Sequence, residues 1–279
     1  MRYKLSAPAT LHTTIQLPAS KSISNRALIL HALAQGHIAP SNLSDCDDTR
    51  VMIKALDGNP GHIDILAAGT AMRFLTAYLS VTPGTRIITG TERMQQRPIR
   101  ILVDALRELG AQIEYAGKEG FPPLRITGTE LTGEEISLAG NVSSQYISAL
   151  LMIGPILKNG LRLNLTGEII SRPYINLTLQ LMKEFGADAA WSSKSSITVR
   201  PGKYRDIPFT VESDWSGASY WYQMVALIQD NEKKESTKTE IKLPGLLPRS
   251  YQGDSRGAEI FAKLGVHTTY TDQGVILTK

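Results

Sequence analysis

The sequence predicts an α/β protein, α+β in the wider sense, built from repeated βαβαββ units. Three amphipathic helices are each followed by a glycine and a strand, and these glycines, Gly110, Gly186 and Gly265, are spaced 76 and 79 residues apart. A second set of helical segments, apolar on most sides, lies upstream of these glycines. Helices of that kind are stable only when they are buried. We therefore expect buried helices and outer sheets.

The elements follow from helix caps, apolar periodicity and glycine stops. Small polar residues start apolar helices, and glycine ends them before a short strand. These helices are predicted at 22–36, 70–84, 144–160 and about 216–228, and strands at 86–90, 162–167 and 240–245. Four copies of the unit result, at about 19–67, 68–141, 142–212 and 213–279, the first being shortened near 57–61. The charged stretch 230–238 is predicted to be a solvated loop.

The composition is that of a chain with a large core and a mild positive charge. Of 279 residues, 42% are hydrophobic, and the formal net charge is +4. This charge suits small anionic ligands, but it is too small for the basic surface of a nucleic-acid-binding protein. We therefore expect small anionic molecules as partners, and no nucleic acid.

Cysteine and histidine usage and the apolar runs exclude further classes. The single Cys46 cannot form an internal disulfide, and the five histidines show no ligand spacing, so we expect no metal and no cofactor. The longest apolar run, 146–157, has 12 residues, whereas a membrane helix needs roughly 18. The N-terminal segment lacks the apolar stretch of a secretory signal. We expect a cytoplasmic protein that does not enter a membrane.

Cationic and hydroxyl side chains gather at the predicted start of the first buried helix. Lys21 precedes Ser22 and Arg26, which share one helix face at spacing i, i+4. The positive end of a helix adds to such cations when an anion binds. This pattern favours a binding site over the alternative, an ordinary serine cap with a solvated lysine and arginine.

Three further helix starts and one loop carry similar groups. They are Gly69 with Thr70 and Arg73, Ser143 with Ser144 and Gln145, Ser171 with Tyr174, and the loop residue Arg97. Each is also compatible with a plain helix cap or a surface arginine. Together they describe a pocket for a ligand with phosphate and carboxylate groups, because arginine and lysine pair with those anions. The sequence has no Walker, GxGxxG, GxSxG or metal motif, which disfavours nucleotide and metal chemistry.

Seven segments distributed along essentially the whole chain form a specific combination. They are LPASKSISNRALIL at 17–30, DDTRVMIKAL at 47–56, AGTAMRFLTA at 68–77, RMQQRPI at 93–99, VSSQYISALLM at 142–152, SRPYINLTLQLM at 171–182 and GD at 253–254. The combination resembles 5-enolpyruvylshikimate-3-phosphate synthase, also called 3-phosphoshikimate 1-carboxyvinyltransferase. The resemblance implies transfer of the enolpyruvyl group of phosphoenolpyruvate to the 5-hydroxyl of shikimate 3-phosphate, with release of phosphate, in chorismate and aromatic amino-acid biosynthesis.

The resemblance also implies an enolpyruvyl transferase-like inside-out barrel with two domains of three units each. Residues 19–211 are then one complete substrate-binding domain of three units. Residues 1–18 supply the first strand of a second, incomplete domain, and 212–279 its first unit. This implies a C-terminally truncated member of a family that is usually monomeric at full length. The unpartnered unit is expected to expose apolar surface and either to self-associate or to be poorly ordered.

The matching motifs imply two sets of substrate contacts. The contacts to shikimate 3-phosphate are Lys21, Ser22, Arg26, Ser143, Ser144, Ser171 and Tyr174. The contacts to phosphoenolpyruvate are Lys21, Gly69, Arg97 and Gln145. The family usually has Asn at the position of Ala67 and Pro at that of Phe74, so glyphosate sensitivity stays open.

No catalytic acid or base is assigned to this chain. The Asp and Glu that the family uses for proton transfer are expected beyond Lys279, so we expect the chain to be inactive alone. Glu212, Asp214 and Asp254 receive no acid–base role.

Two alternatives remain at this point. One is the related enolpyruvyl transferase that acts on UDP-N-acetylglucosamine; it typically presents a reactive cysteine in a mobile loop, and Cys46 lies outside the corresponding region 93–123. The other is a non-catalytic module that binds phosphorylated metabolites or RNA ends.

Overall fold

The computed structural model describes residues 11–58, 60–228 and 239–279. It divides into two compact units, Lys21–Val211 and Met1–Ser20 with Glu212–Lys279, which are taken here one at a time. The predicted loop at 230–238 lies outside the described residues. Across the described ranges, no helix is long and apolar enough to cross a membrane.

The unit Lys21–Val211 contains two open four-stranded sheets with the same strand order. One has the order β2-β3-β5-β4 and the other β6-β7-β9-β8. In each sheet the first pair is parallel and the two following pairs are antiparallel. The strands are β2 (His62–Asp64), β3 (Gly84–Thr89), β4 (Gln112–Tyr115), β5 (Leu124–Gly128), β6 (Glu135–Ala139), β7 (Leu161–Thr166), β8 (Ala189–Trp191) and β9 (Ser196–Val199).

Helices connect these strands in the predicted βαβαββ order. The parallel pairs are joined by α3 (Gly69–Ser80) and α6 (Ser144–Ile153), the latter followed by the 3₁₀ turn η1 (Gly154–Ile156). The later crossings use α4 (Glu92–Gln95) with α5 (Arg100–Glu108), and α7 (Arg172–Glu184). Gly110 and Gly186 end α5 and α7 with φ of 102° and 90°, which confirms the predicted left-handed caps.

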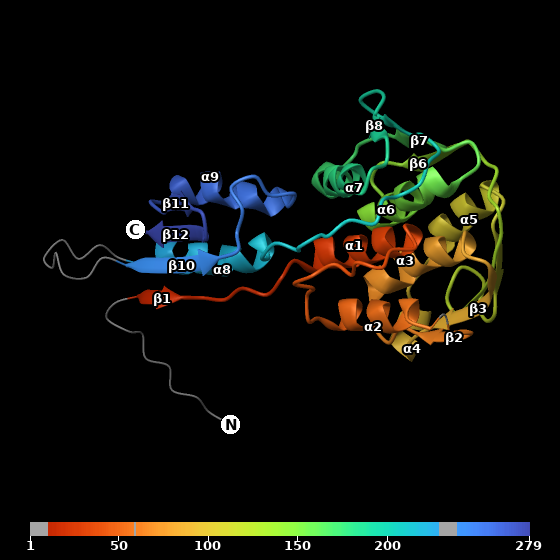
Figure 1. The fold of residues 1–279 in the computed structure, drawn as a ribbon, viewed down its shortest axis with the longest axis horizontal. Helices are drawn as coiled ribbons and strands as arrows, with labels where there is room; N and C mark the ends of the chain where they lie inside the picture. The colour runs from red at the N-terminus through yellow and green to blue at the C-terminus, as the bar shows by residue number, and fades with distance from the viewer. Residues whose placement is uncertain (1–10, 59, 229–238) are drawn as a thin grey trace, which may run out of the picture. The chain divides into compact units, whose positions relative to one another are not determined.

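The helices form the interior of this unit, as predicted. In α1 (Lys21–Leu33), every residue from Ile23 to Leu30 is buried, and in α3 only Tyr78 is partly exposed. Figure 1 shows α1, α3 and α6 running between the two sheets, and each of these three helices contacts the other two. An α/β fold with buried helices and outer sheets is therefore confirmed.

The unit made of residues 1–20 and 212–279 has a third sheet with the same pattern, β1-β10-β12-β11. Its parallel pair joins β1 (His12–Thr14) to β10 (Glu240–Pro244), and β11 (His267–Thr271) and β12 (Gly274–Thr278) complete it. Helix α8 (Trp215–Ala226), the turn η2 (Gly253–Arg256) and α9 (Gly257–Ala262) accompany the sheet. Gly265, with φ of 80°, follows α9 as predicted. A core around Trp215 and Tyr222 fills this unit.

The first of the four predicted copies is shortened, as predicted, but the boundaries between the copies differ from the prediction. Range 19–67 holds α1 and α2 (Asp47–Leu56) but no sheet of its own among the described residues, because its strand β2 pairs into the next sheet. Each sheet takes its first strand from the chain before its first helix, so the copy boundaries shift by one strand. All three described sheets are open, and in the unit Lys21–Val211 the helices lie on the inside.

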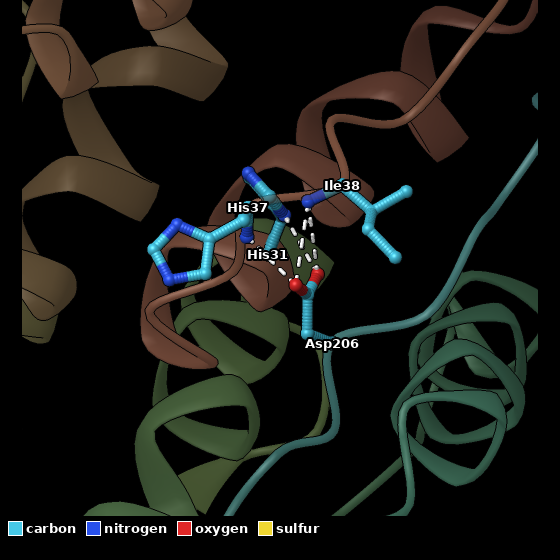
Figure 2. A network of polar contacts seen from close by, with 4 residues as sticks. All are labelled: His31, His37, Ile38 and Asp206. Carbon is cyan, nitrogen blue, oxygen red and sulfur yellow. Dashed lines mark hydrogen bonds and ion pairs between the residues drawn. The ribbon is translucent and has the colours of Figure 1, made fainter.

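A carboxylate explains why no strand follows α1. The backbone N–H groups of His37 and Ile38 donate to the Asp206 carboxylate at 2.7 and 3.3 Å, and His31 Nδ1 lies 3.8 Å from it (Figure 2). These hydrogen bonds lower the pKa of Asp206. The donors that a strand would offer to a sheet are thereby used locally, and only an isolated bridge from Ser41 to Thr210 forms.

Candidate anion-binding site

The buried guanidinium of Arg26 joins the first turns of three helices. Arg26 on α1 is 3% exposed; its Nε donates to Thr178 Oγ1 on α7 at 2.7 Å, and its Nη2 to Ser148 Oγ on α6 at 2.9 Å. Its Nη1 donates back to the Ser22 carbonyl at 2.8 Å. Burial lowers the pKa of Arg26 to about 10, so the side chain stays charged at neutral pH.

This arrangement brings the sequence-predicted residues of three helix starts together. Ser22, Ser144 and Tyr174 each lie one turn before a member of the Arg26–Ser148–Thr178 group. Because the three members are in hydrogen-bond contact, the turns that precede them are neighbours. Lys21 is the exposed first residue of α1, and Ser171 is the N-cap of α7, whose side chain makes no capping hydrogen bond.

A second group forms at the start of α3. Gln145 Nε2 donates to Thr70 Oγ1 at 3.2 Å, and the Thr70 N–H donates to Asp48 Oδ1 on α2 at 3.0 Å. The Gln145 side chain therefore joins α6 to α3, next to Ser144 of the first group. Ser143 Oγ accepts the Gln145 N–H at 3.3 Å and so also serves as an ordinary cap of α6.

Gly69 lets two guanidinium groups approach the backbone. A Cβ at this position would lie 2.5 Å from Arg97 Nη1 and 2.8 Å from Arg73 Nη1, which is closer than real contacts allow. The predicted pairing of Gly69 with Arg97 in space is thus present, although 28 positions separate them in the chain. Any side chain larger than hydrogen would displace these cations.

The cations at these helix starts have a nearby carboxylate in Asp48, which accepts the Thr70 N–H and raises the pKa of Arg73, but it lies on α2. None of α1, α3, α6 and α7 has an acidic residue in its first turn. Within Lys21–Val211, no described carboxylate forms an ion pair with Lys21, Arg73 or Arg97. Burial lowers the pKa of Arg73, and the nearby Arg97 lowers it further. Helix dipoles and unpaired cations together favour an anionic ligand.

Comparison with known proteins agrees with this geometry. The model of the family described as EPSP synthase (3-phosphoshikimate 1-carboxyvinyltransferase) matches residues 5–58 and 59–279. The chain belongs to the EPSP synthase family.

Relatives and solved structures of this family extend beyond the part that the chain matches. A 3-phosphoshikimate 1-carboxyvinyltransferase of Bacteroides fragilis is 71% identical over 279 residues, all of this chain and 66% of the relative. One of Shewanella halifaxensis is 38% identical and matches 94% of this chain and 66% of its own length. An EPSP synthase structure from Acinetobacter baumannii shares the fold, with a TM-score of 0.77 at 20% identity, over 96% of this chain and 64% of that one. The chain thus spans about two thirds of the relatives' length.

Ala67 and Phe74, which the resemblance marks as departures from the family pattern, lie just before α3 and within it. Phe74 is fully buried, and its ring lies 5.2 Å from the Arg26 guanidinium carbon. A proline at position 74 would lack a backbone N–H, so α3 would lose one backbone hydrogen-bond donor. Ala67 lies just before Ala68, the N-cap of α3.

The three carboxylates without an assigned role belong to the other unit and have local partners. Asp214 caps α8 by accepting the Gly217 N–H at 3.0 Å, and Asp254 accepts a hydrogen bond from Ser216. Glu212 is buried and accepts from Ser250 and Gln252 at 2.6 and 3.1 Å. Burial raises the pKa of Glu212. These contacts give all three a structural role.

Sequence reasoning did not select several residues that build the site. Ser148 and Thr178 hold Arg26, Asp48 holds the start of α3, and Tyr146 OH donates to the Pro98 carbonyl at 2.9 Å. One signal was present: Ser144–Ser148 and Tyr174–Thr178 repeat the i, i+4 spacing of Ser22–Arg26. Across the described chain, no group of three or more His, Cys, Asp or Glu residues is placed to hold a metal ion.

Proposed function

We propose that this chain is the part of an EPSP synthase that binds shikimate 3-phosphate and one wall of the phosphoenolpyruvate site. The whole protein then transfers the enolpyruvyl group to the 5-hydroxyl of shikimate 3-phosphate and releases phosphate. The observation that carries the proposal is the Arg26 junction, which makes neighbours of three helix starts that bear the family's motifs.

Each helix start contributes a different kind of group. The Lys21 ammonium and the Ser22, Ser144 and Ser171 hydroxyls suit a phosphate monoester, which accepts several hydrogen bonds at once. Ser143 and Tyr174 add contacts to the shikimate ring in this proposal. Arg26 itself uses three of its N–H groups on the protein, so its main contribution is to hold the helix starts in register. A direct contact of Arg26 to the ligand stays a prediction.

The second group suits a compact ligand with a carboxylate and a phosphate. Arg97 offers a planar fork of donors beside Gly69, and Gln145 Nε2 has a second N–H for an anion while the first donates to Thr70. Lys21 at the head of α1 serves both ligands in this proposal. Holding the two substrates side by side supplies the proximity that enolpyruvyl transfer requires.

Proton transfer is a separate requirement. The reaction needs a base for the 5-hydroxyl and an acid for the methylene carbon. We assign neither role to this chain, because Asp48 is bound to α3 and the carboxylates of the other unit have local partners. We therefore expect the 279-residue chain to bind substrate without turnover. Its cytoplasmic location and oligomeric state stay predictions.

Titration calorimetry on the 279-residue chain tests the proposal. Shikimate 3-phosphate should bind, whereas UDP-N-acetylglucosamine and mononucleotides should not, which separates both alternative functions. Ser171→Ala should weaken shikimate 3-phosphate binding about fivefold, since one hydrogen bond to a charged group is lost. Ser219→Ala in the other unit is a matched control. Equal binding of mononucleotides would refute the proposal.

A further inference from the structure

Among the described residues of Lys21–Val211, Arg97 forms no ion pair, yet the backbone that carries it is fixed by hydrogen bonds. Arg97 lies in the turn between α4 and α5, where its N–H donates to the Met94 carbonyl at 3.0 Å. The next residue, Pro98, offers its carbonyl to Tyr146 OH at 2.9 Å. This bond ties the turn to α6, beside Gln145.

Tyr146 also contacts a second cation. The residue is 7% exposed, and the Arg73 guanidinium carbon lies 5.8 Å from the centre of its ring. Arg73 Nη1 donates to the Gly69 carbonyl at 2.8 Å, which fixes the guanidinium at the start of α3. One aromatic side chain thus joins the helix that carries Arg73 and the turn that carries Arg97.

The two guanidiniums converge although they repel each other. Both come within 3 Å of the point where a Gly69 Cβ would stand. Arg73 is 6% exposed, and its Nε finds no hydrogen-bond partner among the described residues. Arg97 is exposed, so only the Arg73 charge is shielded from water, and like charges this close separate unless they are tethered or an anion lies between them. The Tyr146 hydrogen bond tethers the backbone of the turn that carries Arg97, and the unpartnered Arg73 Nε indicates a ligand.

We infer that Tyr146 and Arg73 are positioning residues, which hold the Arg97 guanidinium over Gly69 so that an anionic group of phosphoenolpyruvate is clamped there. The inference rests on the proposed function and extends it to two residues outside the predicted contact set. Tyr146 acts through the Pro98 carbonyl, and Arg73 acts through its charge and its stacking on the Tyr146 ring. Neither needs to touch the shikimate ligand.

Tyr146→Phe is the sharpest test, because it removes only the hydroxyl. Phosphoenolpyruvate is titrated into the 279-residue chain saturated with shikimate 3-phosphate, by calorimetry and by the rise in unfolding temperature. The expected result is a loss of phosphoenolpyruvate affinity of about fivefold in Tyr146→Phe and about tenfold in Arg73→Lys. Affinity for shikimate 3-phosphate should change less than about twofold, which shows that both variants are folded.

Tyr204→Phe is the matched control. Tyr204 is also buried, and its hydroxyl donates to the Met152 carbonyl at 2.7 Å, toward the other end of α6. It therefore reports what loss of a buried tyrosine hydrogen bond does to stability alone, and its affinity for phosphoenolpyruvate should equal that of the unmodified chain.

The outcomes separate the inference from the function on which it rests. If the unmodified chain does not bind shikimate 3-phosphate, the proposed function fails. If it binds shikimate 3-phosphate but not phosphoenolpyruvate, or if Tyr146→Phe and Tyr204→Phe bind phosphoenolpyruvate equally well, the positioning role is overturned.

Discussion

Helices α6 and α8 hold the same place in their βαβαββ units, but their surroundings differ. Each precedes the second strand of its sheet, which is parallel to the first. All residues from Tyr146 to Ile153 of α6 are buried, whereas on α8 and at its C-cap Tyr220 is 68% and Leu227 73% exposed. The repeat therefore specifies local topology, while burial depends on how many helices pack together.

The comparison also explains where the ligand site forms. Within Lys21–Val211, α1, α3, α6 and α7 bring four helix starts together, and we propose that their polar caps form one site. In the other unit, the start of α8 has its caps satisfied by Asp214 and Gln252. The predicted exposure of apolar side chains on the last unit is confirmed by Tyr220, Met224 and Leu227.

The largest expected effect is loss of the Arg26 junction. Arg26→Met removes three hydrogen bonds where three helices meet, while Ser148 and Thr178 keep their bond to each other. We expect the free energy of unfolding to fall by about 3 kcal/mol, as measured by urea titration followed by circular dichroism. Arg256→Met, at an exposed position of the other unit, should change it by less than about 0.5 kcal/mol. A similar fall in the free energy of unfolding in both variants would contradict a stabilising role for the Arg26 hydrogen bonds.

A smaller effect is expected at Gly69. Gly69→Ala places a methyl group where Arg97 and Arg73 now lie, and the flexible Arg97 side chain must move. We expect phosphoenolpyruvate affinity to fall about tenfold, with stability changed by less than about 1 kcal/mol. Gly202→Ala is the control, since a Cβ there meets open space. Unchanged affinity in Gly69→Ala would place the ligand away from this point.

A charged substitution tests whether the exposed apolar side chains of α8 mediate self-association. Leu227→Lys adds a cation beside the C-terminal end of α8, where the helix dipole favours it. We expect self-association in sedimentation velocity to weaken severalfold, with stability changed by less than about 0.5 kcal/mol. Ile101→Lys, at an exposed apolar position of the other unit, should leave association unchanged. Association that persists in Leu227→Lys would locate the contact elsewhere.

The smallest effect concerns pH. Because burial raises the pKa of Glu212, its contribution favours folding at low pH and is lost as pH rises through the folded-state value. Glu212→Gln should therefore flatten the fall in stability between acidic and neutral pH, by less than about 1 kcal/mol. The pH dependence that Asp206 contributes is opposite. Its lowered pKa stabilises the unit Lys21–Val211 at neutral pH, and this contribution is lost as the pH falls. Parallel pH profiles for Glu212→Gln and the unmodified chain would contradict the first assignment.

Local features of the fold were predictable, and distant pairings were not. Gly110, Gly186 and Gly265 act through their own backbone conformation, so their helix stops could be predicted from neighbouring residues. The missing strand after α1 depends on Asp206, far along the chain, and no local pattern indicates it. Similarly, the shared face of Ser22 and Arg26 follows from helical spacing, whereas the Arg26 partners Ser148 and Thr178 come from other helices. The resemblance to a family selected the site residues, but it did not predict the Tyr146 tether.

The pairing of β1 with β10 has a consequence for synthesis of the chain. His12 pairs with Glu240, so this sheet cannot begin to close until the ribosome has passed the whole of Lys21–Val211. The continuous unit in between depends on no such wait and can mature while translation proceeds. Until then, the first strand is an open edge that other nascent chains can pair with, which makes it the aggregation hazard of the newborn protein.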